Sequence, residues 1–192
     1  MLTGWRKKRL RASALKRRQD AARRQPDAGR ALVAHFPDAA WPALHAVVAG
    51  YRPVRGEMDP APLMETFLLE QALLALPVVT GPDQPLHFRS YAPGDPLLQG
   101  AFGIGEPEPR KPVLTPSLVL VPLVAFDSRC HRLGYGGGYY DRTLAALRAK
   151  GPVIAVGLAY EAQRVGRLPA GSHDMALDYV VTERSCHRGE TA

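Results

Sequence analysis

The sequence predicts a single α/β domain in which a mostly parallel sheet is flanked by helices in three layers (αβα). Two continuous apolar runs, residues 117–127 and 153–160, are typical of strands buried on both faces of a parallel sheet. Helical patterns at 59–73 and 139–150 alternate with the strands along the chain, as βαβ units require. At 192 residues, with 46% hydrophobic and 22% charged residues, the chain has the size and composition of one globular domain, residues 1–192.

The N-terminal segment, residues 1–30, is strongly basic. It holds 11 of the 25 Lys and Arg residues but two of the 18 Asp and Glu residues, so the net charge of +7 becomes −2 in the rest of the chain. Residues 5–24 contain neither Gly nor Pro and are rich in helix formers, which predicts a helix. Lys7 and Arg11 are four positions apart and share one face of it. A solvated face, a mitochondrial transit peptide and contact with an anion all remain open for this segment.

The body of the chain reads as alternating strands and helices. In order, we predict a strand at 43–54, a helix at 59–73, strands at 76–80 and 86–91, a loop at 92–116, a strand at 117–127, a helix at 139–150, and strands at 153–160 and 178–183. Asp59 is suited to cap the first of these helices, and Pro60 to its first position. The loop is long and rich in Pro and Gly, and such loops are commonly functional. Residues 184–192 are expected to form a disordered tail.

Composition excludes several classes of protein. The longest uncharged run, residues 112–126, contains three prolines and is shorter than the roughly 20 apolar residues of a membrane helix. The two cysteines, Cys130 and Cys186, are each followed by histidine, but the usual zinc-ligand spacings are missing. A chain of this size does not need a disulfide, so we expect a reducing, cytoplasmic environment and no membrane partner.

Four glycines are concentrated in residues 132–142, "RLGYGGGYYDR", between a predicted strand and a predicted helix. Strand, Gly-rich loop and helix form the layout of a phosphate site, because successive free N–H groups and the helix N-terminus both attract anions. The loop is neither a Walker A motif nor a dinucleotide fingerprint, and a tight turn is the alternative interpretation. We expect Gly137 to need a positive φ. Asp141 suits the first helical turn, and it also stands where a phosphate-bound Mg²⁺ would accept a carboxylate.

A longer stretch around this loop, "VPLVAFDSRCHRLGYGGGYYDRTL", closely resembles the signature of the 5-formyltetrahydrofolate cyclo-ligase (5,10-methenyltetrahydrofolate synthetase) family. Further segments resemble other family motifs in the right order: "KKRLR" (7–11), "RGEMD" (55–59), "FGIGEP" (102–107) and "LPAGSHDMALDYVVTE" (168–183). The resemblance implies cyclisation of 5-formyltetrahydrofolate to 5,10-methenyltetrahydrofolate, dependent on ATP and Mg²⁺, with release of ADP and phosphate. The formyl oxygen would attack the γ-phosphate, N10 would add to the activated carbon, and phosphate would leave. Such chemistry depends on positioning and charge stabilisation.

The resemblance also implies roles for individual residues. The expected ATP-binding residues are Lys7, Arg11, Arg132, Gly134, Tyr135, Gly136, Gly137, Gly138, Tyr139, Tyr140 and Asp141. The expected folate-binding residues are Glu57, Met58, Phe102 and Tyr140, with Tyr139 lining the same pocket. The expected Mg²⁺ ligands are Asp141 and Asp174. His173 is expected to be structural. Without the family, ordinary packing or surface roles would be favoured for Glu57, Phe102, Tyr139 and Tyr140.

The chain departs from the family pattern in the loop. Some members carry basic residues where this chain has Tyr135 and Gly137, so Arg132 and the N-terminal helix are expected to carry more of the phosphate charge. We expect a monomer acting on a small-molecule folate, in monoglutamate or polyglutamate form. Two alternatives remain: an α/β enzyme acting on a phosphosugar or CoA ester, and a nucleic-acid-binding protein using the basic segment. The shortage of aromatic residues in that segment and the acidic body argue against nucleic acid.

Overall fold

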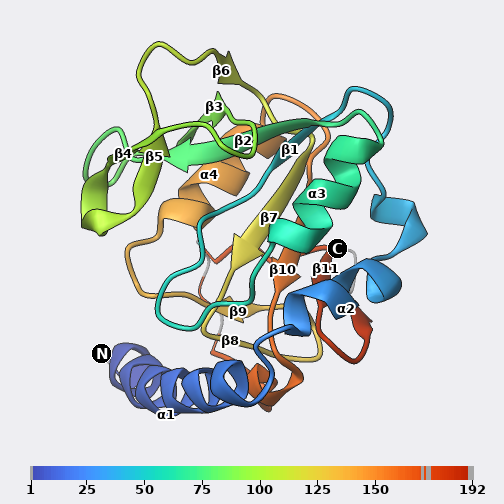
Figure 1. Cartoon of the computed structure of the whole chain (residues 1–192). Coiled ribbons are helices and arrows are strands. Elements are labelled where there is room, and N and C mark those ends of the chain that lie inside the picture. Colours follow the sequence, from blue (N-terminus) through green and yellow to red (C-terminus); the bar gives the residue numbers. More distant parts are fainter. Residues whose placement is uncertain (1, 170, 172–173, 190–192) are drawn as a thin grey trace.

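An eight-stranded sheet forms the centre of the computed structural model, which describes residues 2–169, 171 and 174–189 (Figure 1). From edge to edge its strands are β12 (Cys186–Arg188), β11 (Tyr179–Val181), β10 (Ile154–Leu158), β7 (Leu118–Pro122), β1 (Val47–Ala49), β2 (Leu73–Val78), β3 (His87–Ser90) and β6 (Val113–Leu114). The five strands from β11 to β2 are parallel, and each of the outer strands β12, β3 and β6 pairs antiparallel with the strand on its inner side. The predicted mostly parallel sheet is therefore confirmed.

The two strands predicted to be buried on both faces lie at the centre of the sheet. Four of the five residues in β7, and four of the five in β10, are buried, as their continuous apolar sequences require. The predicted strand at 117–127 is nevertheless too long. It ends at Pro122, which has no N–H to continue the ladder, and residues 125–126 form the short β8 (Ala125–Phe126), which pairs with β9 (Arg132–Leu133).

Helices cover both faces of the sheet, which gives the predicted three layers. On one face, α2 (Ala28–His35) and α3 (Ala61–Leu69) bury Leu32, Leu63 and Phe67 against β1, β2 and β7. On the other, α4 (Tyr139–Arg148) buries Leu144 against a second cluster.

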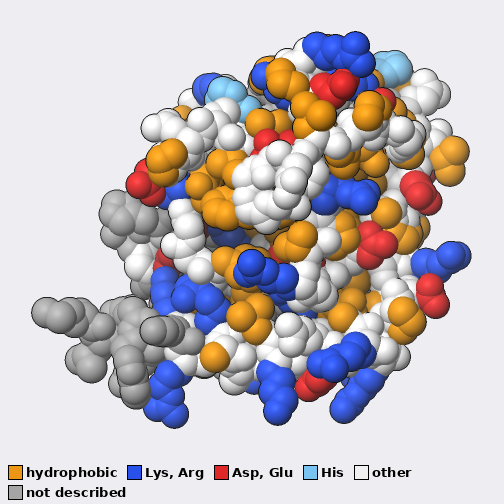
Figure 2. Space-filling model, turned by 60° about the vertical axis from the view of Figure 1, so that its left-hand side comes forward, with side chains coloured by type: hydrophobic (Ala, Val, Ile, Leu, Met, Phe, Trp, Pro, Cys, Tyr) orange, Lys and Arg blue, Asp and Glu red, His pale blue; other side chains and the backbone are white. Residues whose placement is uncertain are grey.

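The basic helix α1 (Leu2–Arg24) lies across one end of the sheet, next to β8 and β9 (Figure 1). Its contact there is a small apolar cluster that includes Ala14, Val124 and Leu133. Figure 2 shows Lys and Arg side chains along the lower edge of the molecule, the level at which Figure 1 places α1. The helix predicted at 5–24 lies within α1, whereas the basic segment 1–30 as a whole is not one helix, because the chain turns around Pro26 and α2 begins at Ala28.

Two segments predicted to lack regular structure contain strands. Within 92–116, β4 (Leu97–Gln99) and β5 (Gly105–Pro107) form a hairpin whose tip is a short 3₁₀ turn at Ala101–Gly103, and β6 joins the main sheet. The expected disordered tail is wrong for 186–188, because the backbone of β12 pairs with β11. Residues 190–192 of that tail, and His173, lie outside the described residues.

Neither cysteine forms a disulfide in the described structure. Cys130 is a buried free thiol and Cys186 an exposed one. None of the described helices is both long and apolar enough to cross a membrane.

Candidate functional site

A cavity of about 860 Å³ opens at the carboxyl ends of the central strands, where ligands bind in open α/β sheets. Its walls come from α1, the segment after β1, the tip of the β4–β5 hairpin, the glycine loop and the first turn of α4. The predicted site residues that line it are Lys7, Arg11, Glu57, Phe102, Arg132, Gly134, Tyr135, Gly136, Gly137, Gly138, Tyr139, Tyr140, Asp141 and Asp174. Segments more than 160 positions apart therefore meet in one place.

Met58 is the exception among the predicted residues. Its side chain is fully buried in the core on the α2–α3 side of the sheet and does not line the cavity. Glu57 lines the cavity while Met58 packs in the core, so the two adjacent side chains do not face the same space. The main chain of Met58 does reach a cavity residue, because its carbonyl accepts a hydrogen bond from the Tyr51 hydroxyl at 2.6 Å.

The glycine loop offers its backbone to the cavity. None of the N–H groups of residues 134–138 donates a hydrogen bond to a described residue. Gly136 and Gly138 have φ values of +105° and +68°, which favour glycine, and Gly138 caps the N-terminus of α4. The expectation of a positive φ at Gly137 is wrong, because the left-handed conformations fall on its two neighbours. Free N–H groups at a helix N-terminus are the physical basis of an anion site.

Three basic side chains surround this loop. Lys7 Nζ lies 2.6 Å from Asp174 Oδ2, and Arg11 Nε donates to the Gly134 carbonyl at 2.7 Å. Arg132 is nearly buried, and its Nη2 lies 2.6 Å from Asp141 Oδ1. Burial lowers the pKa of Arg132, and the neighbouring Asp141 carboxylate opposes that effect. The positive charge expected near phosphate is therefore concentrated at this end of the cavity.

Asp141 and Asp174 are held in similar ways. In each, one carboxylate oxygen accepts a hydrogen bond from a basic side chain and a second from a backbone N–H. The Met175 N–H donates to Asp141 Oδ1 at 3.0 Å, and the Gly171 N–H donates to Asp174 Oδ2 at 2.7 Å. Burial disfavours the charge on Asp174, but the Gly171 N–H and Lys7 outweigh it, so its pKa is lowered. The second oxygens, Asp141 Oδ2 and Asp174 Oδ1, accept no hydrogen bond from the described part of the chain.

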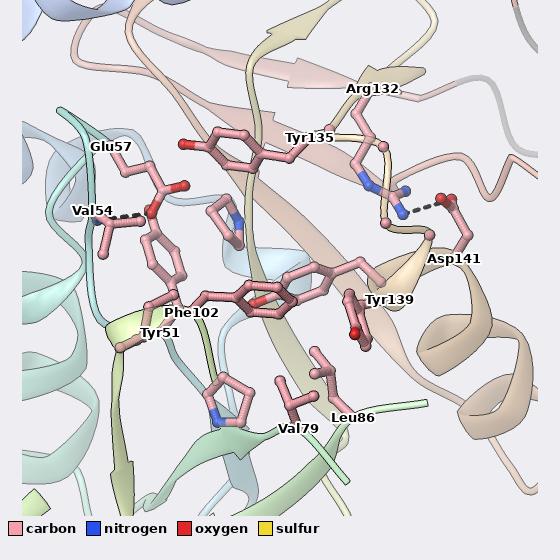
Figure 3. Close-up of a pocket in the computed structure, with 18 of the residues that line it drawn as sticks. Tyr51, Val54, Glu57, Val79, Leu86, Phe102, Arg132, Tyr135, Tyr139 and Asp141 are labelled. Atoms are coloured by element: carbon pink, nitrogen blue, oxygen red, sulfur yellow. Dashed lines mark hydrogen bonds and ion pairs between the residues drawn. The ribbon is translucent and has the colours of Figure 1, made fainter. Parts of the chain in front are cut away.

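Glu57 marks the other end of the cavity (Figure 3). Its side chain is almost buried, and its Oε2 accepts the Val54 N–H at 3.0 Å. The turn that carries it runs through Arg55 and Gly56, both with positive φ. Burial raises the pKa of Glu57, and the Val54 N–H and the charge of Arg18 oppose that rise.

Aromatic rings line the cavity between its two ends. Phe102 has a φ of +61° and is 71% exposed, yet its ring meets that of Tyr139 edge to face at a centroid distance of 5.9 Å. Figure 3 shows both rings above Val79 and Leu86. Burial raises the pKa of Tyr140 far above its ordinary value, so this phenol is neutral. The surface can therefore accept a flat, largely apolar ring system.

Several residues of the site were not predicted from the sequence. Tyr51, Arg52, Arg55 and Glu106 line the cavity, and Arg18 does not line it but forms an ion pair with the lining residue Glu57. Arg18 carried a detectable signal. Lys7, Arg11, Ala14 and Arg18 follow the 4–3–4 spacing of one helical face, so the face that carries the two predicted phosphate contacts also carries Arg18.

Known proteins share this sequence and fold. The sequence model of the 5-formyltetrahydrofolate cyclo-ligase family matches residues 4–183. The chain is 37% identical over 135 residues to the 5-formyltetrahydrofolate cyclo-ligase of Haemophilus influenzae, covering 68% of this chain and 72% of that protein. It is 35% identical over 145 residues to the enzyme of the same name from Mycolicibacterium smegmatis, covering 71% and 73%.

The fold agrees with these sequence matches. The NMR structure of 5,10-methenyltetrahydrofolate synthetase from Aquifex aeolicus superposes with a TM-score of 0.75 and 31% identity, over 97% of this chain and 94% of that one. The resemblance drawn from the glycine loop and its companion motifs is thereby confirmed. The chain belongs to the 5-formyltetrahydrofolate cyclo-ligase family.

Proposed function

We propose that this protein uses ATP to close 5-formyltetrahydrofolate to 5,10-methenyltetrahydrofolate, with release of ADP and phosphate. The proposal is supported by family membership and by one observation above all: a single cavity joins a glycine loop with free N–H groups to an aromatic wall with a buried carboxylate. Neither alternative function, on a phosphosugar or CoA ester or on nucleic acid, finds support in the family match, the relatives or the related structure.

ATP is proposed to bind at the glycine-loop end. The N–H groups of residues 134–138 and the N-terminus of α4 suit phosphate oxygens. Lys7, Arg11 and Arg132 supply positive charge there, as phosphoryl transfer requires. Tyr135, Tyr139, Tyr140 and Asp141 border the same end.

The same end suits a magnesium ion. Mg²⁺ typically takes one or two carboxylate oxygens together with substrate phosphates, and Asp141 Oδ2 and Asp174 Oδ1 both lack a partner among the described residues. We propose that these two residues hold it, where it would neutralise phosphate charge. Lys7 and Arg132 fix the orientation of the two carboxylates.

The folate is proposed to lie along the aromatic wall, with its reacting end near Glu57. The formyl oxygen attacks the γ-phosphorus of ATP, which breaks the bond to ADP and makes phosphate a leaving group. N10 then adds to the formyl carbon and must lose its proton before phosphate departs. A carboxylate accepts such a proton, and among the described carboxylates that line the cavity Glu57 is the buried one. Phe102, Tyr139 and Tyr140 would contact the pterin and benzoyl rings.

We further propose that the protein acts as a cytoplasmic monomer on a small-molecule folate, without a nucleic-acid or membrane partner. The direct test follows the absorbance of 5,10-methenyltetrahydrofolate as the protein is mixed with 5-formyltetrahydrofolate. Product should accumulate with ATP and Mg²⁺ together, and not when either is omitted. Product formation without ATP, or none with both, would refute the proposal.

A further inference from the structure

Arg18 is a fully buried arginine in the C-terminal half of α1. Its Nη1 donates to the Leu123 carbonyl at 3.2 Å, and its Nη2 donates to the Arg55 carbonyl at 3.0 Å and to the Tyr135 hydroxyl. Nη1 also lies 3.7 Å from Glu57 Oε1. Burying a guanidinium is costly unless partners compensate for lost water, and here they come from three other segments of the chain.

These contacts join the two ends of the cavity. Tyr135 belongs to the glycine loop, and its ring lies between Glu57 and Arg132 in Figure 3. The guanidinium carbon of Arg18 is 5.3 Å from the centre of that ring. The Nε of Arg18 is buried and has no hydrogen-bond partner in the described structure, so the position of the side chain leaves one of its own donors unsatisfied. It is placed to reach Glu57 and Tyr135 together.

We propose that Arg18 is a positioning residue for the reaction: it keeps Glu57 in the carboxylate form facing the folate, and it fixes Tyr135 between the folate and the phosphates. The inference rests on the proposed role of Glu57 as proton acceptor.

The charges around Glu57 support this role. Arg18 faces it from α1, Tyr135 from the glycine loop, Arg55 from its own turn, and the phenols of Tyr51 and Tyr140 from the remaining sides. Burial raises the pKa of both Tyr51 and Tyr140, so both phenols are neutral, and neither supplies a positive charge that could replace that of Arg18. Burial also raises the pKa of Glu57, and the positive charge of Arg18 opposes it. Without that charge, Glu57 stays protonated up to a higher pH. A protonated Glu57 cannot accept the proton that N10 loses.

The test compares the pH dependence of kcat/KM for 5-formyltetrahydrofolate, at saturating ATP and Mg²⁺, in the parent and five variants. Arg18→Met removes the charge at similar length, Arg18→Lys restores a charge, and Tyr135→Phe removes only the hydroxyl. Arg17→Met is the matched control, because Arg17 is the next residue of α1 and its Nε donates to Ala162 instead. Glu57→Gln tests the underlying proposal. Circular dichroism establishes that each variant is folded.

We expect Arg18→Met to move the acidic limb of the profile to higher pH, with a loss of roughly tenfold or more on the acid side that shrinks as pH rises. Arg18→Lys should recover part of that shift, Tyr135→Phe should show a smaller shift in the same direction, and Arg17→Met should match the parent. An unchanged profile in Arg18→Met, or an equal loss at every pH, would overturn the inference.

The remaining outcomes separate the two proposals. If Glu57→Gln keeps parental activity, the proposed role of Glu57 fails and the inference about Arg18 fails with it. If Glu57→Gln is inactive while Arg18→Met keeps the parental profile, only the inference about Arg18 fails. If Arg18→Met does not fold, Arg18→Gln decides, because it removes the charge and keeps hydrogen-bond donors: a shifted acidic limb supports the inference, and a parental one overturns it.

Discussion

At the scale of single residues, the site holds charges where burial disfavours them. Glu57 and Arg132 are both nearly buried, and burial shifts the pKa of each toward the uncharged form. Arg132 has Asp141 at 2.6 Å, whereas the nearest cation to Glu57, Arg18, is 3.7 Å away. The carboxylate is therefore the less fully compensated of the two. Groups kept in this condition lower stability, and they cluster at functional sites, which supports the role proposed for Glu57.

This predicts a pH-dependent stability effect of Glu57→Gln. Because the folded chain holds the Glu57 proton more tightly than the unfolded chain, the contribution of Glu57 to the free energy of unfolding is greatest below its ordinary pKa of 4.5 and falls as pH rises through the raised folded-state pKa. The difference in unfolding free energy, parent minus variant, should therefore decrease with pH over that window. Urea denaturation at a series of pH values measures it, with Glu65→Gln on the exposed face of α3 as control. A difference that rises with pH would contradict the raised pKa.

At the scale of elements, α1 contributes one face to the site. Lys7, Arg11 and Arg18 project from it toward Asp174, the glycine loop and Glu57 respectively, while Ala14 between them packs against the body. A small residue at that position lets the helix approach closely enough for the long basic side chains to reach across.

Lys7→Ala and Arg11→Ala should each raise the KM for ATP by roughly ten- to a hundredfold, because a charge-assisted contact with phosphate contributes roughly 1.5–3 kcal/mol. Both side chains are partly exposed, so the free energy of unfolding should change by no more than about 0.5 kcal/mol. Lys16→Ala, exposed on α1, is the control. Steady-state kinetics with varied ATP decide the question. If both variants keep the parental KM for ATP, Lys7 and Arg11 do not contact ATP and this face of α1 is only a solvated surface.

Two separate elements bring Asp141 and Asp174 together. Asp141 lies in the first turn of α4 and Asp174 in the segment before β11, 33 positions later, and the Met175 N–H to Asp141 bond ties the two segments to each other.

If both carboxylates hold one Mg²⁺, Asp141→Asn and Asp174→Asn should each lower kcat and shift the Mg²⁺ dependence to higher concentrations. The double variant should lose less than the sum of the two, because the residues act as a unit. Asp95→Asn is the control, since Asp95 forms a comparable ion pair with Lys111 and does not line the cavity. Rate is measured against Mg²⁺ at fixed ATP. If both single variants keep the parental Mg²⁺ curve, the metal assignment fails.

At the scale of the whole molecule, the cavity is assembled from segments that the sheet brings to one end. The parallel strands deliver the segments after β1 and β2 to their carboxyl ends, the β4–β5 hairpin supplies Phe102, and α1 closes the space from below. A ligand that binds there contacts both the N-terminal helix and the body, so it should stabilise their packing.

Hydrogen exchange should report this coupling. With ATP and Mg²⁺, amides of α1 and of residues 134–138 should exchange more slowly, and by more than those of β12, which does not border the cavity. In Arg11→Ala, which lacks the bond from α1 to the Gly134 carbonyl, the added protection of α1 should be reduced. Protection confined to residues 134–138 in the parent protein would contradict a role for α1 in binding.

The sequence by itself determined the architecture and most of the site. The continuous apolar runs of β7 and β10 predict burial on both faces, because a strand covered by helices on both sides has no solvent-facing positions for polar side chains. The glycine loop and the basic face of α1 were also readable, since both depend on residues close together in the chain. Family motifs then predicted Glu57, Phe102 and Asp174, which no local pattern would have singled out and which do line the cavity.

Only the tertiary structure decided the features that depend on distant contacts. Met58 points into the core while Glu57 faces the cavity, which depends on how the segment after β1 lies on the sheet. The sequence at 184–192 looks like a polar tail, yet 186–188 pair with β11 because that strand offers an open edge. Arg18 reads as one charge in a basic run, and it becomes a buried link because Glu57 and Tyr135 arrive beside it from 39 and 117 positions away. Such contacts follow from chain closure over long separations, which local sequence does not encode.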